Sequence, residues 1–200
     1  MKYFRIFRQS AEELKNVRCL TVTGLLVALY GVLEFIGITP DTTLKINFGF
    51  LAVGAIGMLY GPVVGMFGAA ACDIVGVLVK PVNGFNPVFT LIAVVQGLIY
   101  GMVAYRMLSA RSGKGRYIEM TVRMVIGRLL EVGIVNIVLN TITVYYMYSL
   151  SAKQTLGAYF TTKITKNLAE LPADLILTVL LTPIILRIFE SVFGRRRTSA

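Results

Sequence analysis

The sequence contains no histidine and few acidic residues. Its 200 residues include 10 Asp and Glu against 20 Lys and Arg. Without imidazole, the commonest general base and metal ligand is missing. The acids inside apolar stretches lie in different segments and form no carboxylate pair; they are Glu34, Asp73, Glu131 and Asp174. No HExxH, CxxC or GxSxG motif occurs, so the sequence predicts a protein that is not an enzyme and carries no cofactor.

Cysteine and nucleotide-binding motifs are equally sparse. Cys19 and Cys72 share no CxxC spacing, which argues against a disulfide or a metal site. Residues 110–116 (ARSGKGR) superficially resemble a phosphate-binding loop, but they lack the GxxxxGK[ST] frame and no strand precedes them. We therefore interpret them as a solvated basic loop.

Apolar residues, in contrast, are abundant. They make up 56% of the chain, whereas charged residues make up 15%. This composition lies outside the range of soluble globular proteins. Several apolar runs reach the roughly 18–20 residues that a helix needs to cross a bilayer. The sequence thus predicts an all-α integral membrane protein.

The basic residues gather in three clusters that flank the apolar runs. These clusters are Lys2, Arg5, Arg8, Lys15 and Arg18; Arg106, Arg111, Lys114 and Arg116; and Arg195, Arg196 and Arg197. Because cytoplasmic segments of membrane proteins are rich in Lys and Arg, all three clusters should be cytoplasmic. Nucleic-acid binding explains the pattern less well, because no aromatic platform is interleaved with the cations.

These constraints predict a single domain with six membrane-spanning helices and cytoplasmic termini. Residues 1–17 form an amphipathic basic segment, residues 18–190 the bundle and residues 191–200 a basic tail. Gly61-Pro62 should break the long apolar run 46–79 into two spans. A re-entrant 46–60 segment is the alternative, but it would place the basic ends on opposite sides. The segment 149–166 is expected to be the longest external segment.

The predicted fifth span, 123–148, carries polar residues where lipid should reject them. Asn136 and Asn140 fall on one face at about 100° per residue, and Glu131 falls on another. We therefore expect the two amides and the Arg128/Glu131 pair to serve separate purposes. The amides should face protein or ligand, because unsatisfied amides in hydrocarbon are costly. Polar contacts between helices are the alternative.

Amides, cations and aromatic rings converge in the predicted external half. The polar residues there are Lys45, Asn47, Lys80, Asn83, Asn86, Asn136, Asn140, Thr141 and Lys163, and the aromatic ones are Phe48, Phe85, Phe89, Tyr145 and Tyr146. Such a set suits a flat heteroaromatic ligand with an acidic tail. Amides would bind the ring edges, aromatic side chains the ring faces and a lysine the carboxylate.

A pair of small residues marks the predicted first span. Gly24 and Ala28 are four residues apart, a spacing that lets a second helix approach closely. The partner helix could belong to the chain itself or to another protein.

Several stretches together resemble the substrate-binding (S) components of energy-coupling factor (ECF) vitamin transporters, in particular the folate-transporter S-component family. They are KINFGFLAVGAIGMLYGPVVGMFGAAACDIVG (45–76), NGFNPVFTLIAVVQGLIYG (83–101), VNIVLNTITV (135–144) and KITKNLAELP (163–172). The resemblance covers most of residues 18–190. Its most folate-like mark is the triplet Leu139-Asn140-Thr141.

The resemblance implies a plasma-membrane S component of a prokaryote that binds its vitamin on the external side. It implies that Asn136, Asn140 and Thr141 hydrogen-bond a pterin edge and that Lys163 lies near the glutamate carboxylates. Phe85, Phe89 and Tyr145 would stack on the ring, and Asn83 and Lys80 complete the expected ligand-binding set.

The resemblance further implies partner proteins. Gly24 and Ala28 would dock on a transmembrane coupling subunit, which works with two ATP-binding subunits. Two departures stand out, since Thr143 lies where the family usually has Trp and Lys163 where it commonly has Arg. Pantothenate, riboflavin, or a thiamine or pyridoxine precursor remain alternative ligands. A stand-alone carrier or channel with Arg128, Glu131 and Asp174 as a relay is the alternative class.

Overall fold

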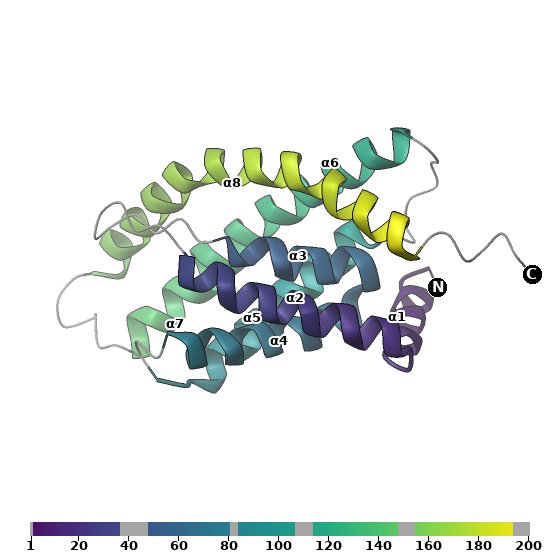
Figure 1. Cartoon of the computed structure of the whole chain (residues 1–200). Coiled ribbons are helices and arrows are strands. Elements are labelled where there is room, and N and C mark those ends of the chain that lie inside the picture. The colour runs from purple at the N-terminus through teal and green to yellow at the C-terminus, as the bar shows by residue number, and fades with distance from the viewer. Residues whose placement is uncertain (1, 37–47, 81–83, 107–113, 148–154, 194–200) are drawn as a thin grey trace, which may run out of the picture.

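The computed structural model of the chain describes residues 2–36, 48–80, 84–106, 114–147 and 155–193. Every regular element in these ranges is helical (Figure 1). The elements are α1 (Lys2–Glu13), α2 (Val17–Ile36), α3 (Gly49–Tyr60), α4 (Pro62–Val79), α5 (Pro87–Ala104), α6 (Lys114–Glu131), the π-helix η2 (Val132–Leu139), α7 (Asn140–Met147) and α8 (Leu156–Phe193).

The helices have the length and composition of membrane spans. Among the described residues, α2, α4, α5 and α8 are long and apolar enough to cross a bilayer, and α3 is a shorter apolar helix. The prediction of an all-α membrane protein is thereby confirmed. The predicted break is confirmed as well. Gly61 has a φ of +86°, which suits a residue without Cβ, and Pro62 begins α4.

The central element is α3, all of whose residues are buried. Neighbouring helices approach α3 and one another through glycines. A Cβ added to Gly97 in α5 would lie 2.1 Å from the carbonyl oxygen of Gly65 in α4, and one added to Gly101 would lie 2.3 Å from Cα of Pro62. The backbones of α4 and α5 are thus in direct contact, which only residues without side chains permit.

The second half of the chain is built from two long helical rods. Helices α6, η2 and α7 continue from Lys114 to Met147, and α8 packs beside α6. The segment 149–166, which is expected to be external, is helical from residue 156 onward, because α8 begins at Leu156. Threonine hydroxyls there donate to carbonyls one turn earlier, as in Thr161 to Gly157 (3.0 Å) and Thr165 to Thr161 (2.9 Å). Polar residues can therefore continue the helix.

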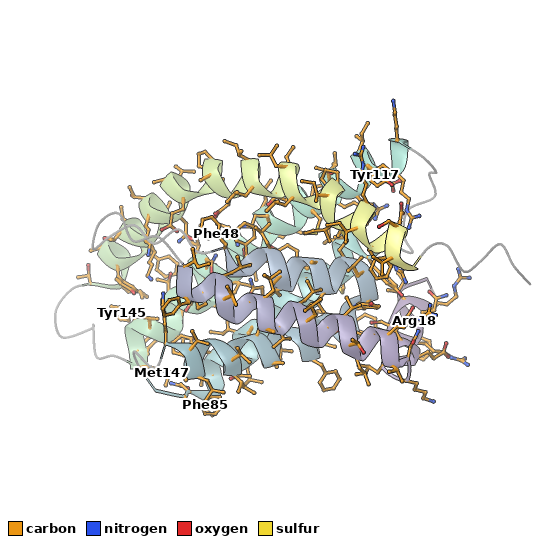
Figure 2. All side chains as sticks on the ribbon, in the orientation of Figure 1. Arg18, Phe48, Phe85, Tyr117, Tyr145 and Met147 are labelled. Carbon is orange, nitrogen blue, oxygen red and sulfur yellow. The ribbon has the colours of Figure 1, made fainter. Side chains whose placement is uncertain are left out.

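The helix α1 and the last turns of α8 lie at the same end of the bundle (Figure 1). The Ser10 hydroxyl fixes α1 to the turn between α3 and α4. It donates to the Tyr60 carbonyl (2.7 Å) and accepts from the backbone N–H groups of Val63 (3.0 Å) and Val64 (3.2 Å). Figure 2 shows Phe85 and Met147 at the opposite end from Arg18.

Candidate functional site

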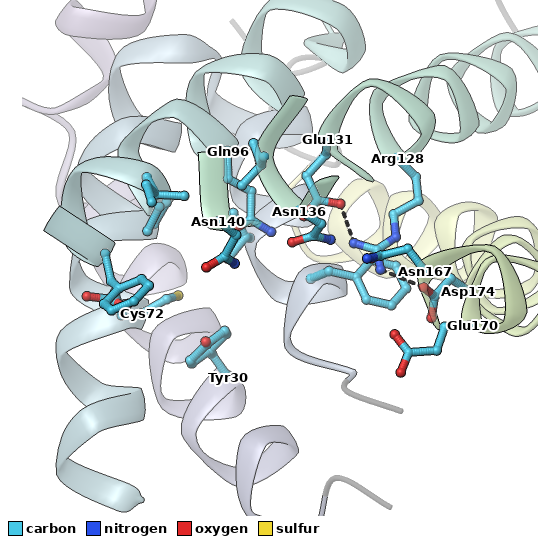
Figure 3. A pocket seen from close by; sticks show the side chains of 18 of the residues that line it. Tyr30, Cys72, Gln96, Arg128, Glu131, Asn136, Asn140, Asn167, Glu170 and Asp174 are labelled. Carbon is cyan, nitrogen blue, oxygen red and sulfur yellow. Dashed lines mark hydrogen bonds and ion pairs between the residues drawn. The ribbon is translucent and has the colours of Figure 1, made fainter. Parts of the chain in front are cut away.

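A cavity of about 290 Å³ lies between the glycine-packed helices and the two long rods (Figure 3). Its wall contains amides, charged groups and aromatic rings. The amides are Gln96, Asn136, Asn140 and Asn167; the charged residues are Asp73, Arg128, Glu131, Lys163, Lys166, Glu170 and Asp174; and the aromatic residues are Tyr30, Phe50 and Phe89.

A buried ionic cluster centred on Arg128 forms one part of this wall (Figure 3). One guanidinium nitrogen of Arg128 donates to Glu131 in the same helix, and the other donates to Asp174 of α8 at 2.6 Å. The guanidinium also lies 3.8 Å from the ring centroid of Phe50 in α3. The cation–π contact and the two carboxylates thus offset the free-energy cost of removing the Arg128 guanidinium from water. The cluster fixes α6 to α8 across 46 residues of sequence.

The π-helix η2 changes which residues share the cavity wall. Residues five apart lie about 140° apart on an α-helix, which separates Glu131 from Asn136. In η2 the bonds run over five residues, since the Asn140 N–H donates to the Val135 carbonyl. Figure 3 accordingly shows Asn136 beside Glu131. The predicted placement of Glu131 on a different side of the helix from the amides is therefore wrong, because Glu131, Asn136 and Asn140 line one cavity. That the two pairs serve separate purposes stays a prediction.

The facing wall on α8 is a stripe with cations at its start and acids further along. Lys163 and Lys166 come first, and Glu170 and Asp174 follow. Lys166 pairs with Glu170 at 3.8 Å. The Lys163 ammonium lies 5.5 Å from the ring centroid of Tyr159, and within the described part of the chain it makes no ion pair.

The remaining wall comes from α2, α4 and α5. In α4, Asp73 accepts a hydrogen bond from the Thr90 hydroxyl of α5 at 2.7 Å. Tyr30, Phe89 and Gln96 add two aromatic rings and an amide. The cavity can therefore contact a flat, polar ligand by its faces and its edges.

The structure brings some of the predicted ligand-binding residues to the cavity and leaves others away from it. Phe89, Asn136, Asn140 and Lys163 line the wall. Phe85 and Lys80 do not, because Phe85 precedes α5 and is 58% exposed, and Lys80 caps the end of α4. Asn83 lies outside the described residues.

Thr141 and Tyr145 are also absent from the described wall, although both are buried. The Thr141 hydroxyl donates to the Asn136 carbonyl at 3.3 Å and so bonds within its own rod. Tyr145 packs against Tyr146 and Tyr159, with centroid distances of 5.4 and 6.2 Å. The structure therefore does not bring these two side chains to the described cavity wall, and their contact with the ligand stays a prediction.

Among the wall residues that sequence reasoning did not select for the site are Tyr30, Gln96, Arg128, Glu131 and Asp174. The sequence does contain a signal for the three charged residues, because an ionisable residue within a membrane span usually faces a cavity or a partner. Tyr30 and Gln96 carry no such signal. Only the packing of α2 and α5 brings them to the site.

Gly24 and Ala28 lie on the outer face of α2. Both residues are exposed, and a Cβ added to Gly24 would meet no atom within 4 Å. Packing of this pair within the chain, the first of the two alternatives, is therefore wrong for the described residues.

A helical bundle with an apolar surface and a polar cavity is typical of a membrane-embedded binding protein. The chain belongs to the family of ECF transporter substrate-specific components, whose family model matches residues 18–182. The resemblance to S components is thereby confirmed. Because the family consists of transporter subunits, the prediction that the chain is not an enzyme is confirmed as well.

Relatives within this family carry more specific names. The folate transporter FolT of Clostridium novyi (strain NT) is 29% identical over 130 residues, which cover 64% of this chain and 67% of the relative. The folate transporter FolT of Leuconostoc mesenteroides subsp. mesenteroides is 26% identical over 158 residues, covering 78% and 80%. A crystal structure of FolT bound with folic acid matches with a TM-score of 0.65 and 29% identity, covering 82% of this chain and 90% of that one.

Proposed function

We propose that this chain captures folate at the external side of the cell membrane for ATP-driven uptake by partner subunits. The observation that carries the proposal is the cavity, which gathers amides, aromatic rings and Lys163, a lysine without an ion pair to any residue that the structure describes, in one enclosure. Two relatives named as folate transporters and a similar structure bound with folic acid support it.

The wall residues suggest how the ligand is held. Asn136 and Asn140 would hydrogen-bond the edge of the pterin, together with Gln96 of α5. Phe89 and Tyr30 would contact its faces. Lys163 would pair with a carboxylate of the glutamate tail, because a tail carboxylate is a suitable counter-ion for this ammonium group.

The proposed topology has six spans with both termini in the cytoplasm. The segments would be α2, α3, α4, α5, the rod α6–η2–α7, and α8. The basic residues near α1 and near the start of α6 support the cytoplasmic placement of that end. The end that carries Phe85 and Met147 would then face the outside (Figure 2).

Assembly with a transmembrane coupling subunit would use the outer face of α2. Gly24 and Ala28 are exposed there and leave room for another helix to approach. We expect Gly24→Leu to preserve folate binding and to block co-purification with the coupling subunit and the two ATP-binding subunits.

The binding test compares Asn140→Ala with Asn16→Ala, which removes an amide at the cytoplasmic end. Asn140→Ala should weaken folic acid binding by well over tenfold, because the pterin then lacks a hydrogen-bond partner in an enclosed site. Asn16→Ala should bind like the wild type. Isothermal titration calorimetry measures both affinities, and an unchanged affinity for Asn140→Ala would remove that residue from the site.

Two outcomes would redirect the assignment. Retention of riboflavin, pantothenate or another vitamin in place of folate, identified by mass spectrometry of the purified protein, would keep the class and change the ligand. Uptake of folate into vesicles that hold this chain alone, without ATP, would instead favour a stand-alone carrier.

A further inference from the structure

The charges around the cavity do not balance. The described wall contains three cations, Arg128, Lys163 and Lys166, and four carboxylates, Asp73, Glu131, Glu170 and Asp174. With ordinary charges at neutral pH, one negative charge is left over. This excess is unexpected in a site proposed to receive a ligand with an acidic tail.

The excess is concentrated at the buried Arg128 cluster. Lys166 pairs with Glu170, and Asp73 accepts a hydrogen bond from the Thr90 hydroxyl. Both acids are partly exposed. Glu131 and Asp174, in contrast, are 2% and 4% exposed and share a single guanidinium.

Among the residues that the structure describes, no second cation lies at hydrogen-bond distance from the two acids of the cluster. Phe50 of α3 lies over the guanidinium, and Tyr100 of α5 also faces Arg128 and Glu131. Tyr30 of α2 and Cys72 of α4 line the same cavity and are neutral in their ordinary forms. Lys163 makes no ion pair in the described part of the chain and stands beside Tyr159. Within the described ranges, Arg128 is therefore the one positive charge that pairs with Glu131 and Asp174.

Ligand binding makes this imbalance more costly. A ligand that fills the cavity displaces water, and electrostatic repulsion strengthens when water leaves. Two carboxylates that lie close enough to repel each other relieve the repulsion when one of them takes up a proton. A glutamate tail adds further negative charge to the same enclosure.

We propose that folate binding is coupled to the uptake of one proton by the Glu131–Asp174 pair. The inference rests on the proposed function and concerns the same cavity. The complex then holds one proton more than the free protein, so affinity falls as the pH rises. By linkage, one proton changes the affinity by at most about tenfold per pH unit, over the range in which the pair is ionised in the free protein and protonated in the complex.

The test is titration of the full chain with folic acid in phosphate and in Tris at one pH. These two buffers release protons with different heats, so the difference in observed heat gives the number of protons taken up. We expect about one proton per folate in the wild type. Glu131→Gln and Asp174→Asn each replace an acid by an uncharged isostere, and in at least one of them the buffer difference should vanish and the pH dependence should flatten. The control Glu12→Gln, at an exposed residue of α1, should retain both.

The outcomes separate this inference from the proposed function. Equal heats in the two buffers, with folate bound, would overturn the proton coupling and leave the function intact. A buffer difference that persists in both variants would also overturn it, because the proton would then reside elsewhere. A wild-type protein that binds no folate contradicts the proposed function itself.

Discussion

The two halves of the bundle are held together by opposite means. In α3, α4 and α5, glycines bring backbones into contact, so that a Cβ on Gly65 would lie 2.6 Å from the Gly97 carbonyl oxygen. Between α6 and α8, long side chains make the contact, and Arg128 bonds Asp174 at 2.6 Å. The first half is apolar and close-packed, whereas the second carries most of the buried charge.

This difference assigns separate tasks to the two halves. Close backbone contact leaves no space for a ligand and tolerates little displacement, so the glycine-packed helices form a fixed platform. Side-chain contacts leave room between α6 and α8, and their polar groups can exchange partners with a ligand. The cavity therefore lies where the platform meets the polar half.

The largest expected effect comes from removing the cation of the polar half. Arg128→Leu would leave Glu131 and Asp174 buried without their shared counter-ion. Breaking a buried pair in this way costs about 3–5 kcal/mol of unfolding free energy. Thermal unfolding in detergent should show a large loss for Arg128→Leu and almost none for Arg8→Leu, whose exposed side chain pairs with Glu12 at the surface. Equal stability of the two variants would mean that the cluster does not hold α6 to α8.

A slightly smaller loss is expected in the platform. Gly97→Ala places a Cβ 2.1 Å from a backbone oxygen of α4, so the two helices must separate. Overpacking of this kind costs about 3 kcal/mol. The matched control is Gly24→Ala, where a Cβ meets no atom within 4 Å. If unfolding experiments find Gly97→Ala as stable as Gly24→Ala, α4 and α5 can accommodate a side chain between their backbones.

The two halves also differ in how far their structure can be predicted from sequence. In the platform, the break at Gly61-Pro62 follows from local chemistry, and dense small residues indicate close helix contacts. The polar half depends on long-range and register effects. The pairing of Arg128 with Asp174 spans 46 residues, which spacing along one helix cannot reveal.

The candidate site shows the same limit. Asn140 and Lys163 could be selected because polar groups in a membrane protein tend to face a cavity or an interface. The π-helix could not be predicted from the sequence. The amide and apolar residues of Val132–Leu139 have no pattern that distinguishes hydrogen bonds over five residues from hydrogen bonds over four. That change of register moves Asn136 toward Glu131. It also engages the Thr141 hydroxyl within the rod, so that a residue expected at the ligand is placed elsewhere.

Thr141→Val tests this last point and has the smallest expected effect. The substitution keeps the side-chain shape but removes the hydroxyl that donates to the Asn136 carbonyl at 3.3 Å. Because a backbone carbonyl in a helix has other partners, the loss should be about 1 kcal/mol of unfolding free energy. Folic acid affinity should stay within a few-fold of the wild type, in contrast to Asn140→Ala one position earlier. Calorimetry on the two variants decides between the assignments. A tenfold or greater loss of affinity in Thr141→Val, at unchanged stability, would return the hydroxyl to the ligand and require α7 to rotate toward the cavity on binding.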